Sequence, residues 1–227
     1  MKKAFTLAEV LITLAIIGVV AAMTIPTLIG NYKKLVVEVR LAKFYNNMNH
    51  ALKLSTIDNG ALESWDAFVG EYVYNEEGYV VAQTCTNVLD WYNKYLAKYL
   101  KTVNVEEAEN DVEGRILVYF QDGSMASLTG STWLFYPYAN DYSTTEFYVG
   151  SFKNRDKSVS GTKYFVFVFV RDKGLLTFDN GWDGTKEHLL NHPSLGCNEE
   201  ATNERAYCTK LIQLNNWKIP KDYPFKF

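Results

Sequence analysis

The sequence predicts an α+β protein in which one long N-terminal helix packs on an antiparallel β-sheet domain. Two observations predict it: an apolar run near the N-terminus continues into an amphipathic helical pattern, and strand and turn signals dominate the second half. We expect the helix at residues 5–58, preceded by the short segment 1–4, and a globular domain at residues 59–227. At 227 residues, the chain is long enough for that domain to bury a sizeable core.

The first half of the predicted helix has the length and composition of a membrane span. Val10 to Gly30 is a run of 21 residues without a charge, which at about 1.5 Å per residue gives roughly 31 Å of helix. Glu9 lies directly before this run. A carboxylate near the centre of a membrane costs at least ~2.5 kcal/mol, so Glu9 needs a partner there.

The second half of the helix carries an apolar face. Between residues 31 and 58, apolar and small residues recur at spacings of three and four, and Asn59-Gly60 is a helix stop signal. The predicted face consists of Leu35, Val39, Ala42, Tyr45, Met48, Leu52 and Ser55. Upstream, Pro26 interrupts the helix. Because proline removes a backbone donor and crowds the preceding turn, it predicts either a static kink or a local opening.

Beyond the long helix, the pattern predicts one short helix and then an antiparallel sheet. An apolar face predicts a helix within residues 86–100. Asp122-Gly123 is a strong hairpin signal, and the strand at 163–170 is expected near the centre of the sheet. Strands are predicted at residues 115–120, 124–128, 132–136, 163–170 and 175–178. The 16 Tyr and 13 Phe residues agree with a β-rich domain, because aromatic side chains favour strands.

The N-terminus resembles a known signature. Lys2-Lys3-Ala4 followed by Phe5-Thr6-Leu7-Ala8-Glu9-Val10-Leu11-Ile12 is similar to the start of type IV pilins and of the pseudopilins of type II secretion. The resemblance implies that residues 1–4 are a prepilin leader that is removed by cleavage between Ala4 and Phe5. It also implies N-methylation of the new Phe5 amine and neutralisation of that amine by Glu9 of a neighbouring subunit. Ala4 stands where glycine is commoner in the family, and alanine is also small. In the family, a proline at the position of Pro26 marks a stretch that loses helicity when subunits pack.

Two alternatives to this leader are an ordinary secretory signal and an uncleaved signal anchor. A secretory signal would be cut at a small-residue site such as Ala21-Ala22-Met23. Both alternatives leave Glu9 and the start at Phe5 unexplained. Lysines flank the span on both sides, so charge bias by itself does not fix the orientation, and the resemblance places the C-terminal part outside the cytoplasm.

The resemblance implies a pilin-like fold and a structural function as a pilin or pseudopilin subunit of a type IV pilus or type II secretion-type fibre. The implied partners are a prepilin peptidase and N-methyltransferase, other pilin subunits and the bacterial inner membrane. The subunit would lie in that membrane before assembly and in a surface or periplasmic fibre afterwards. A second hypothesis is a membrane-tethered surface binding protein, such as a minor pilin-like adhesin, that is exported with a pilin leader.

The sequence gives no sign of an enzyme. It contains no nucleophile elbow, phosphate-binding loop or dinucleotide fingerprint. His188 and His192 have the spacing of a helical metal pair, but Pro193 follows and no Glu lies between them. Removal of Lys2 and Lys3 lowers the formal net charge from −3 to −5, which argues against nucleic acid as a general partner without excluding a local basic patch.

One polar cluster, residues 179–184, could bind Ca²⁺. Asp179, Asn180 and Asp183 supply the hard oxygen ligands that Ca²⁺ prefers, and major pseudopilins have a calcium site in a late loop. The alternative is a tight turn, because Asn-Gly and Asp-Gly form such turns without a metal. No other cofactor is expected.

The three cysteines, Cys85, Cys197 and Cys208, lie outside the predicted span. Three pairings are possible in principle. The stretch from Cys197 to Cys208 resembles the C-terminal disulfide loop of many pilins, which implies that these two are bonded. Cys85 is then the unpaired thiol.

Overall fold

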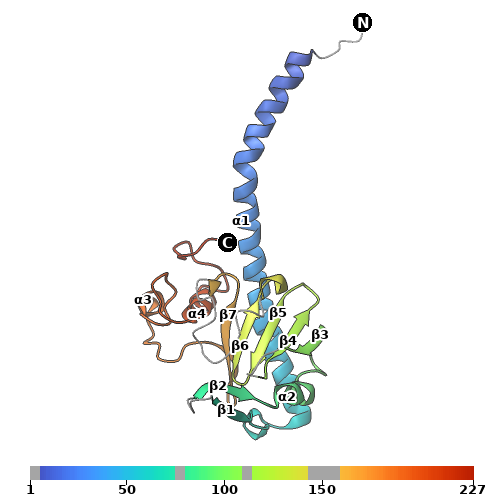
Figure 1. Ribbon diagram of the computed structural model, residues 1–227, viewed down its shortest axis with the longest axis vertical. Helices are drawn as coiled ribbons and strands as arrows, with labels where there is room; N and C mark the ends of the chain where they lie inside the picture. The colour runs from blue at the N-terminus through green and yellow to red at the C-terminus, as the bar shows by residue number, and fades with distance from the viewer. Residues whose placement is uncertain (1–5, 75–79, 109–113, 143–158) are drawn as a thin grey trace.

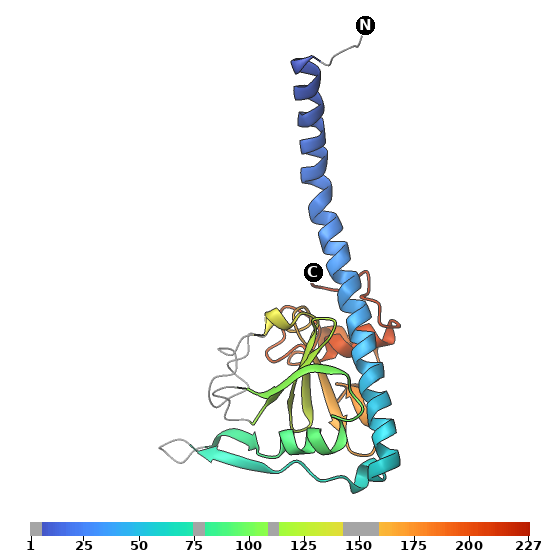
Figure 2. The same cartoon turned by 90° about the vertical axis from the view of Figure 1, so that its right-hand side faces the viewer.

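The computed structural model describes residues 6–74, 80–108, 114–142 and 159–227, and its longest element is helix α1 (Leu7–Asn59). The N-terminal half of α1 runs free of the rest of the chain, and its second half lies along the globular part, called the head below (residues 60–227) (Figures 1 and 2). This layout confirms the predicted α+β architecture. It also confirms the long helix, whose expected first residue, Phe5, lies outside the described residues.

Helix α1 is continuous across Pro26 and curves gently above the head (Figure 1). The helix ends at Gly60, where the backbone has a φ of 78°, so the Asn59-Gly60 stop signal is confirmed. The predicted apolar face is only half right. Met48, Leu52 and Ser55 are buried as expected, but the face begins with other residues, namely Val37, Glu38, Leu41 and Phe44.

The head is built on a six-stranded antiparallel meander in which each strand pairs with the next along the chain. Its strands are β3 (Thr102–Glu107), β4 (Ile116–Phe120), β5 (Met125–Thr129), β6 (Thr132–Tyr136), β7 (Phe165–Val170) and β8 (Gly174–Thr177). The five predicted strands are confirmed, and β3 was missed. Strand β7 pairs with β6 and β8, so it is interior, but it lies next to the edge strand rather than at the centre.

A separate two-stranded ribbon and several short helices complete the head. The ribbon, which was not predicted, consists of β1 (Gly70–Tyr74) and β2 (Val80–Cys85). The predicted helix within residues 86–100 is present as α2 (Val88–Tyr95). Two more helices, α3 (Lys186–Asn191) and α4 (Tyr207–Leu214), follow the sheet, and the 3-10 turns are η1 (Leu62–Ser64) and η2 (Ala139–Asp141).

The two faces of the sheet follow the alternation of strand side chains. In β4, Ile116 and Val118 face the α1 side, whereas Leu117 belongs to the cluster on the opposite face. On the α1 side, the ring of Phe44 stacks on Phe135 with centroids 4.4 Å apart. Because aromatic side chains bury large apolar areas, this contact makes α1 a structural part of the head core.

The edge of β8 is closed by a side chain of α1. The Asn49 amide donates to the Leu175 carbonyl at 3.0 Å and accepts from the Leu175 N–H at 3.1 Å, so it pairs with the strand as a neighbouring strand would. Gly174, at a φ of 85°, lets Asn49 approach, since a Cβ there would lie 2.9 Å from the Asn49 Oδ1 atom. The helix therefore fixes the sheet at one edge.

Candidate functional site

The start of α1 is closed by a reciprocal pair of hydrogen bonds between Thr6 and Glu9. The Thr6 hydroxyl accepts from the Glu9 N–H at 3.3 Å, and the Glu9 carboxylate accepts from the Thr6 N–H at 2.8 Å. This capping box satisfies backbone donors that a helix start leaves free. Glu9 therefore has a partner within its own chain. Ala4 and Phe5, the expected cleavage and methylation residues, lie outside the described residues.

The carboxylate of Glu9 keeps one oxygen for another donor. The hydrogen bonds from the N–H and the hydroxyl of Thr6 both end on Oε2, each at 2.8 Å. Oε1 accepts none of the hydrogen bonds that the described residues make. Glu9 can hold its own helix start and still accept a hydrogen bond from outside the chain.

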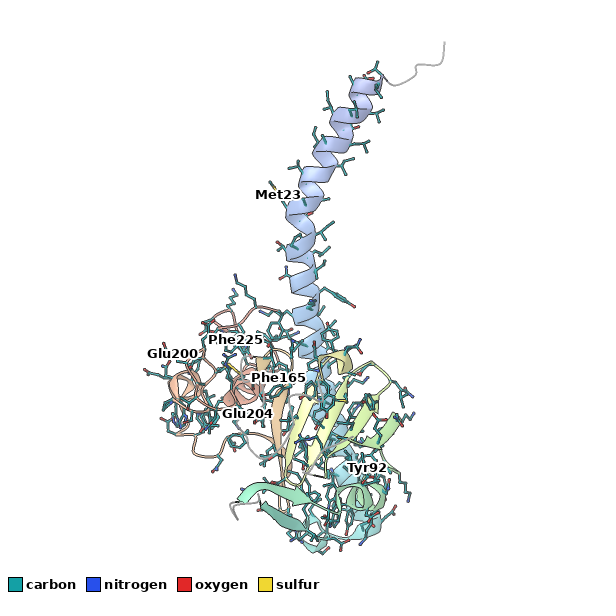
Figure 3. All side chains as sticks on the ribbon, in the orientation of Figure 1. Met23, Tyr92, Phe165, Glu200, Glu204 and Phe225 are labelled. Atoms are coloured by element: carbon teal, nitrogen blue, oxygen red, sulfur yellow. A yellow bond between two sulfur atoms is a disulfide. The ribbon has the colours of Figure 1, made fainter. Side chains whose placement is uncertain are left out.

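The first half of α1 has no cover within the described chain. Its large apolar side chains point outward around the whole helix, and Met23, labelled in Figure 3, is 73% exposed. The helix is long and apolar enough to cross a membrane. A helix that is apolar on all sides has to be buried in lipid or among other helices. Together with the N-terminal signature, this exposure identifies a membrane-anchoring segment.

Two threonine side chains inside this segment form hydrogen bonds with the helix itself. The Thr13 hydroxyl donates to the Val10 carbonyl at 2.9 Å, and the Thr24 hydroxyl donates to the Val20 carbonyl at 2.9 Å. Threonine is tolerated in lipid in this way, because its hydroxyl does not need a partner elsewhere. Pro26 follows Thr24 by two residues and has no N–H to donate. The segment therefore combines a uniform apolar surface with one weakened helical turn.

The second half of α1 is tied to the β4–β5 turn by charged side chains. Arg40 donates to the backbone carbonyls of Asp122 and Pro137, and Lys43 Nζ lies 2.8 Å from Asp122 Oδ2. Burial raises the pKa of Asp122, but the hydrogen bonds from Lys43 and Ser124 outweigh it and hold that pKa below its usual value. A cavity of about 380 Å³ opens beside these contacts, lined in part by Arg40, Lys43 and Asp122. These cations are already engaged in fastening the head to the helix.

The two late histidines lie together but do not form a metal pair. Their ring centroids are 5.0 Å apart. His188 Nδ1 accepts from the Asp183 N–H at 3.0 Å, and His192 Nδ1 accepts from the N–H groups of Ser194 and Leu195, both at 3.1 Å. The Nδ1 lone pair of each ring is therefore engaged by backbone N–H groups and is not free to bind a metal.

The loop proposed for Ca²⁺ is held by hydrogen bonds within the protein. Asp179 Oδ2 lies 2.9 Å from Lys210 Nζ, and the Asn180 carbonyl accepts from the Tyr207 hydroxyl at 2.7 Å. Asp183 Oδ1 accepts from the N–H of Thr185 at 2.8 Å, and this backbone bond is the main cause of the lowered pKa of Asp183.

These contacts fit the alternative of a tight turn better than a calcium site. Over the described ranges, no group of three or more His, Cys, Asp or Glu side chains could hold a metal ion. Calcium binding by Asp179, Asn180 and Asp183 stays a prediction.

The expected disulfide joins Cys197 and Cys208, and Cys85 is a free, buried thiol. Both bonded cysteines pack in one cluster with Tyr207 and Leu211 of α4 and Leu189 of α3. The bond therefore fastens the loop after α3 to α4. Burial raises the pKa of the Cys85 thiol, which keeps it in the unreactive protonated form.

Sequence reasoning missed two residues that matter for this arrangement. Thr6 could have been found, because Thr6-Leu7-Ala8-Glu9 has the spacing of a capping box. Glu38 is a buried carboxylate on α1. Its role could not have been found from the sequence, because its partner Ile219 lies 181 residues further along the chain.

Two family models match the chain. The first, described as a family of unknown function (DUF6613), matches residues 27–227, and the second, described as the prokaryotic N-terminal methylation motif, matches residues 1–25. No curated protein and no solved structure matches. The second match confirms the prepilin-type signature, and it indicates a pilin-like exported protein that is anchored in a membrane.

Proposed function

We propose that this chain, which belongs to the family of unknown function DUF6613, is a structural subunit of a type IV pilus or of a type II secretion-type fibre. The observation that carries the proposal is the first half of α1, most of which lies within the methylation motif at residues 1–25 and whose apolar surface is exposed. In a membrane, lipid covers that surface. In a fibre, the same surface packs against the helices of neighbouring subunits.

The proposal assigns a sequence of partners. A prepilin peptidase cuts between Ala4 and Phe5 on the cytoplasmic side of the inner membrane and methylates the new amine. The head lies outside the cytoplasm, and the mature subunit then joins other subunits in a surface or periplasmic fibre. The role is structural rather than enzymatic.

Glu9 links the membrane state to the assembled state. In the single chain, its carboxylate is held by Thr6 through Oε2. In a fibre, the Phe5 amine of one subunit is buried among apolar helices, where an unpaired charge is strongly unfavourable. Oε1 of a neighbouring Glu9 supplies the missing partner and fixes the axial position of one subunit on the next.

The test compares Glu9→Ala, Glu9→Gln and Thr6→Ala in cells that assemble fibres. Glutamine can still accept from the Thr6 N–H and keep the helix cap, but it carries no charge. Thr6→Ala removes the reciprocal side-chain bond at a cost of about 1 kcal/mol and keeps the charge. We expect both Glu9 variants to be cut and inserted normally but to be nearly absent from sheared fibres, since losing one partner of a buried pair costs ~3–5 kcal/mol. Thr6→Ala should assemble.

The measurement is the ratio of fibre-bound to membrane-bound protein, with N-terminal sequencing of the membrane fraction as the processing control. A Glu9→Gln variant that assembles as well as the wild type would contradict the charge-pairing role. A mature terminus after Ala22 would contradict the pilin proposal itself. Retention of all wild-type protein in the membrane, with no fibres, would favour the tethered binding protein instead.

A further inference from the structure

After α4, the chain turns back toward the exposed half of α1. Asn216 and Trp217 have φ values of 54° and 61°, in the left-handed region, which asparagine tolerates but tryptophan rarely adopts. The turn places the Trp217 ring 5.0 Å from the ring of Tyr45 on α1. From there, the last residues of the sequence run beside α1 to the level where the helix leaves the head, a course that both views show (Figures 1 and 2).

Glu38 holds this returning segment on α1. One carboxylate oxygen accepts from the Ile219 N–H at 2.9 Å, and the other lies 3.0 Å from Lys218 Nζ. Glu38 is only 7% exposed, so its charge is compensated inside the structure by these two donors. Further along, the Tyr223 hydroxyl donates to the Gly161 carbonyl, and the Tyr223 ring stacks on Phe227 with centroids 5.9 Å apart. The position of the segment along the helix axis is therefore fixed at several points.

The end of this segment meets α1 at the boundary of the membrane span. The Phe227 carbonyl oxygen lies 3.5 Å from the place that a Cβ on Gly30 would occupy. The charge-free run that ends at Gly30 is about 31 Å long as a helix, which matches the hydrocarbon core of about 30 Å. When the run fills that core, Gly30 and Phe227 both lie where acyl chains give way to headgroups.

The side chains at this level are aromatic and basic. Tyr32, which is 64% exposed, and Lys33 follow Gly30 by about 3–5 Å along the axis, within the headgroup layer. Lys226 is exposed as well, and Asp141 is an acidic group that interacts with Lys33. We call Tyr32, Lys33, Lys34, Lys226 and Phe227 the interface collar. Figure 3 shows the neighbouring Phe225 at the end of the head from which the exposed helix emerges.

We propose that the interface collar binds anionic phospholipid headgroups and so holds the head against the membrane in the unassembled subunit. Aromatic rings favour the membrane–water interface, and lysines near the surface are attracted to anionic lipids. Because the returning segment is fixed on α1, the head contacts the bilayer through Lys226 and Phe227 of that segment as well as through α1 itself. The inference rests on membrane anchoring and not on fibre assembly, so either proposal can fail alone.

The test uses the full chain, in a Cys85→Ala background, reconstituted into vesicles. A fluorophore is attached at Lys226→Cys, and at Lys53→Cys as the matched control. Because Lys226→Cys removes one collar lysine, the effects of lipid, salt and the other collar lysines are all measured within this labelled background. Lys53 is also an exposed lysine, about 35 Å further along α1 than Gly30. Nitroxide-labelled headgroups then quench any fluorophore that lies in the headgroup layer. Vesicles of phosphatidylcholine alone are compared with vesicles that also contain phosphatidylglycerol.

We expect strong quenching at position 226, increased by phosphatidylglycerol and decreased by salt, and none at position 53. Removing one collar lysine should lower the ratio of heads held against the membrane to heads released from it about fivefold. Lys33→Gln with Lys34→Gln should therefore abolish the gain from phosphatidylglycerol, while Lys53→Gln with Lys173→Gln, an equal loss of charge elsewhere, should preserve it.

The proposal would be overturned if quenching at position 226 were equal to quenching at position 53. It would also be overturned if quenching at position 226 did not change with phosphatidylglycerol, salt or the collar lysines. A fluorophore at position 226 that is unquenched in vesicles but shielded in isolated fibres would identify the collar as a contact between subunits instead.

Discussion

The two halves of α1 have the same secondary structure and opposite relations to the rest of the chain. Leu14, in the first half, is 60% exposed, whereas Leu41, in the second half, is fully buried under the sheet. The two leucines have the same helical backbone conformation, because both lie in one continuous helix. What differs is the partner: the head supplies one for Leu41, and the described chain supplies none for Leu14.

This difference shows that one helix can serve two environments. In the first half, apolar side chains surround the helix, so any rotation about its axis presents the same surface to lipid or to neighbouring helices. In the second half, buried residues such as Leu41, Phe44 and Met48 recur at three- and four-residue spacing, so only one rotation fits the sheet. The first half can therefore be covered from any side, whereas the second half has one fixed attachment.

The largest expected effect compares one substitution in both halves. Leu41→Ala should lower the free energy of unfolding of the head by about 2–5 kcal/mol, because it leaves a cavity in a packed core. Leu14→Ala should leave it unchanged. Denaturant unfolding of both variants in the same detergent measures the difference. Equal effects of the two variants would mean that the first half also packs on the head.

The second prediction concerns a bond confined to the head. Replacing Cys197 and Cys208 by alanine should cost about 2–3 kcal/mol of stability, because the bond closes a loop with a sequence separation of 11 residues. Membrane insertion of α1 should be unaffected. Denaturant unfolding with and without reductant measures the loss, and reductant should change the wild type but not the double variant. A reductant effect on the double variant would mean that the thiol of Cys85 contributes.

The third prediction tests the attachment of the returning segment to α1. Glu38→Ala should cost about 1–3 kcal/mol, because it leaves the buried N–H of Ile219 without its acceptor. Lys218→Ala removes only the half-exposed partner and should cost about 0.2–1 kcal/mol. Thermal unfolding of the two variants provides the comparison. A larger loss for Lys218→Ala would show that the ion pair, and not the backbone contact, holds the segment.

The smallest expected effect is a pH dependence at the junction of α1 and the sheet. Since the folded-state pKa of Asp122 is held below 3.8, its contribution is complete above that value and is lost as the pH falls through the lower, folded-state pKa. The free energy of unfolding should therefore decrease as the solution is acidified below about pH 4. Lys43→Met should reduce this decrease by about 0.2–1 kcal/mol in titrations of head stability. An unchanged pH profile in Lys43→Met would assign the acid sensitivity to other carboxylates.

The sequence predicted the elements of the sheet better than the face of the helix. Strands at residues 116–120 and 132–136 were recognisable because apolar and aromatic runs end at turn residues such as Gly123. The helix face was misplaced at its start: Leu35 and Val39 are exposed, at 51% and 54%. Apolar residues occupy more than one face there, so their spacing alone does not select which face packs. Strand β3 was missed because its residues alternate weakly and most of them stay exposed.

The sequence by itself determined the properties that depend on neighbouring residues. These are the charge-free span, the prepilin-type start with Glu9 and the turn at Gly60. The cap at Thr6, which we missed, also follows from a local pattern. Each follows from local chemistry: hydropathy, a hydrogen bond within one helical turn, or a backbone angle that glycine adopts. The sequence alone therefore determined that the chain is anchored at its N-terminus.

Only the tertiary structure decided which distant groups meet. Asn49 forms hydrogen bonds with Leu175 at the edge of β8, and Glu38 accepts a hydrogen bond from the Ile219 N–H. Phe227 lies beside Gly30, where the charge-free run ends. No local pattern marks these residues, because a contact between segments more than 120 residues apart depends on how the intervening sheet stacks. That stacking places the last residues of the sequence beside Gly30 on α1.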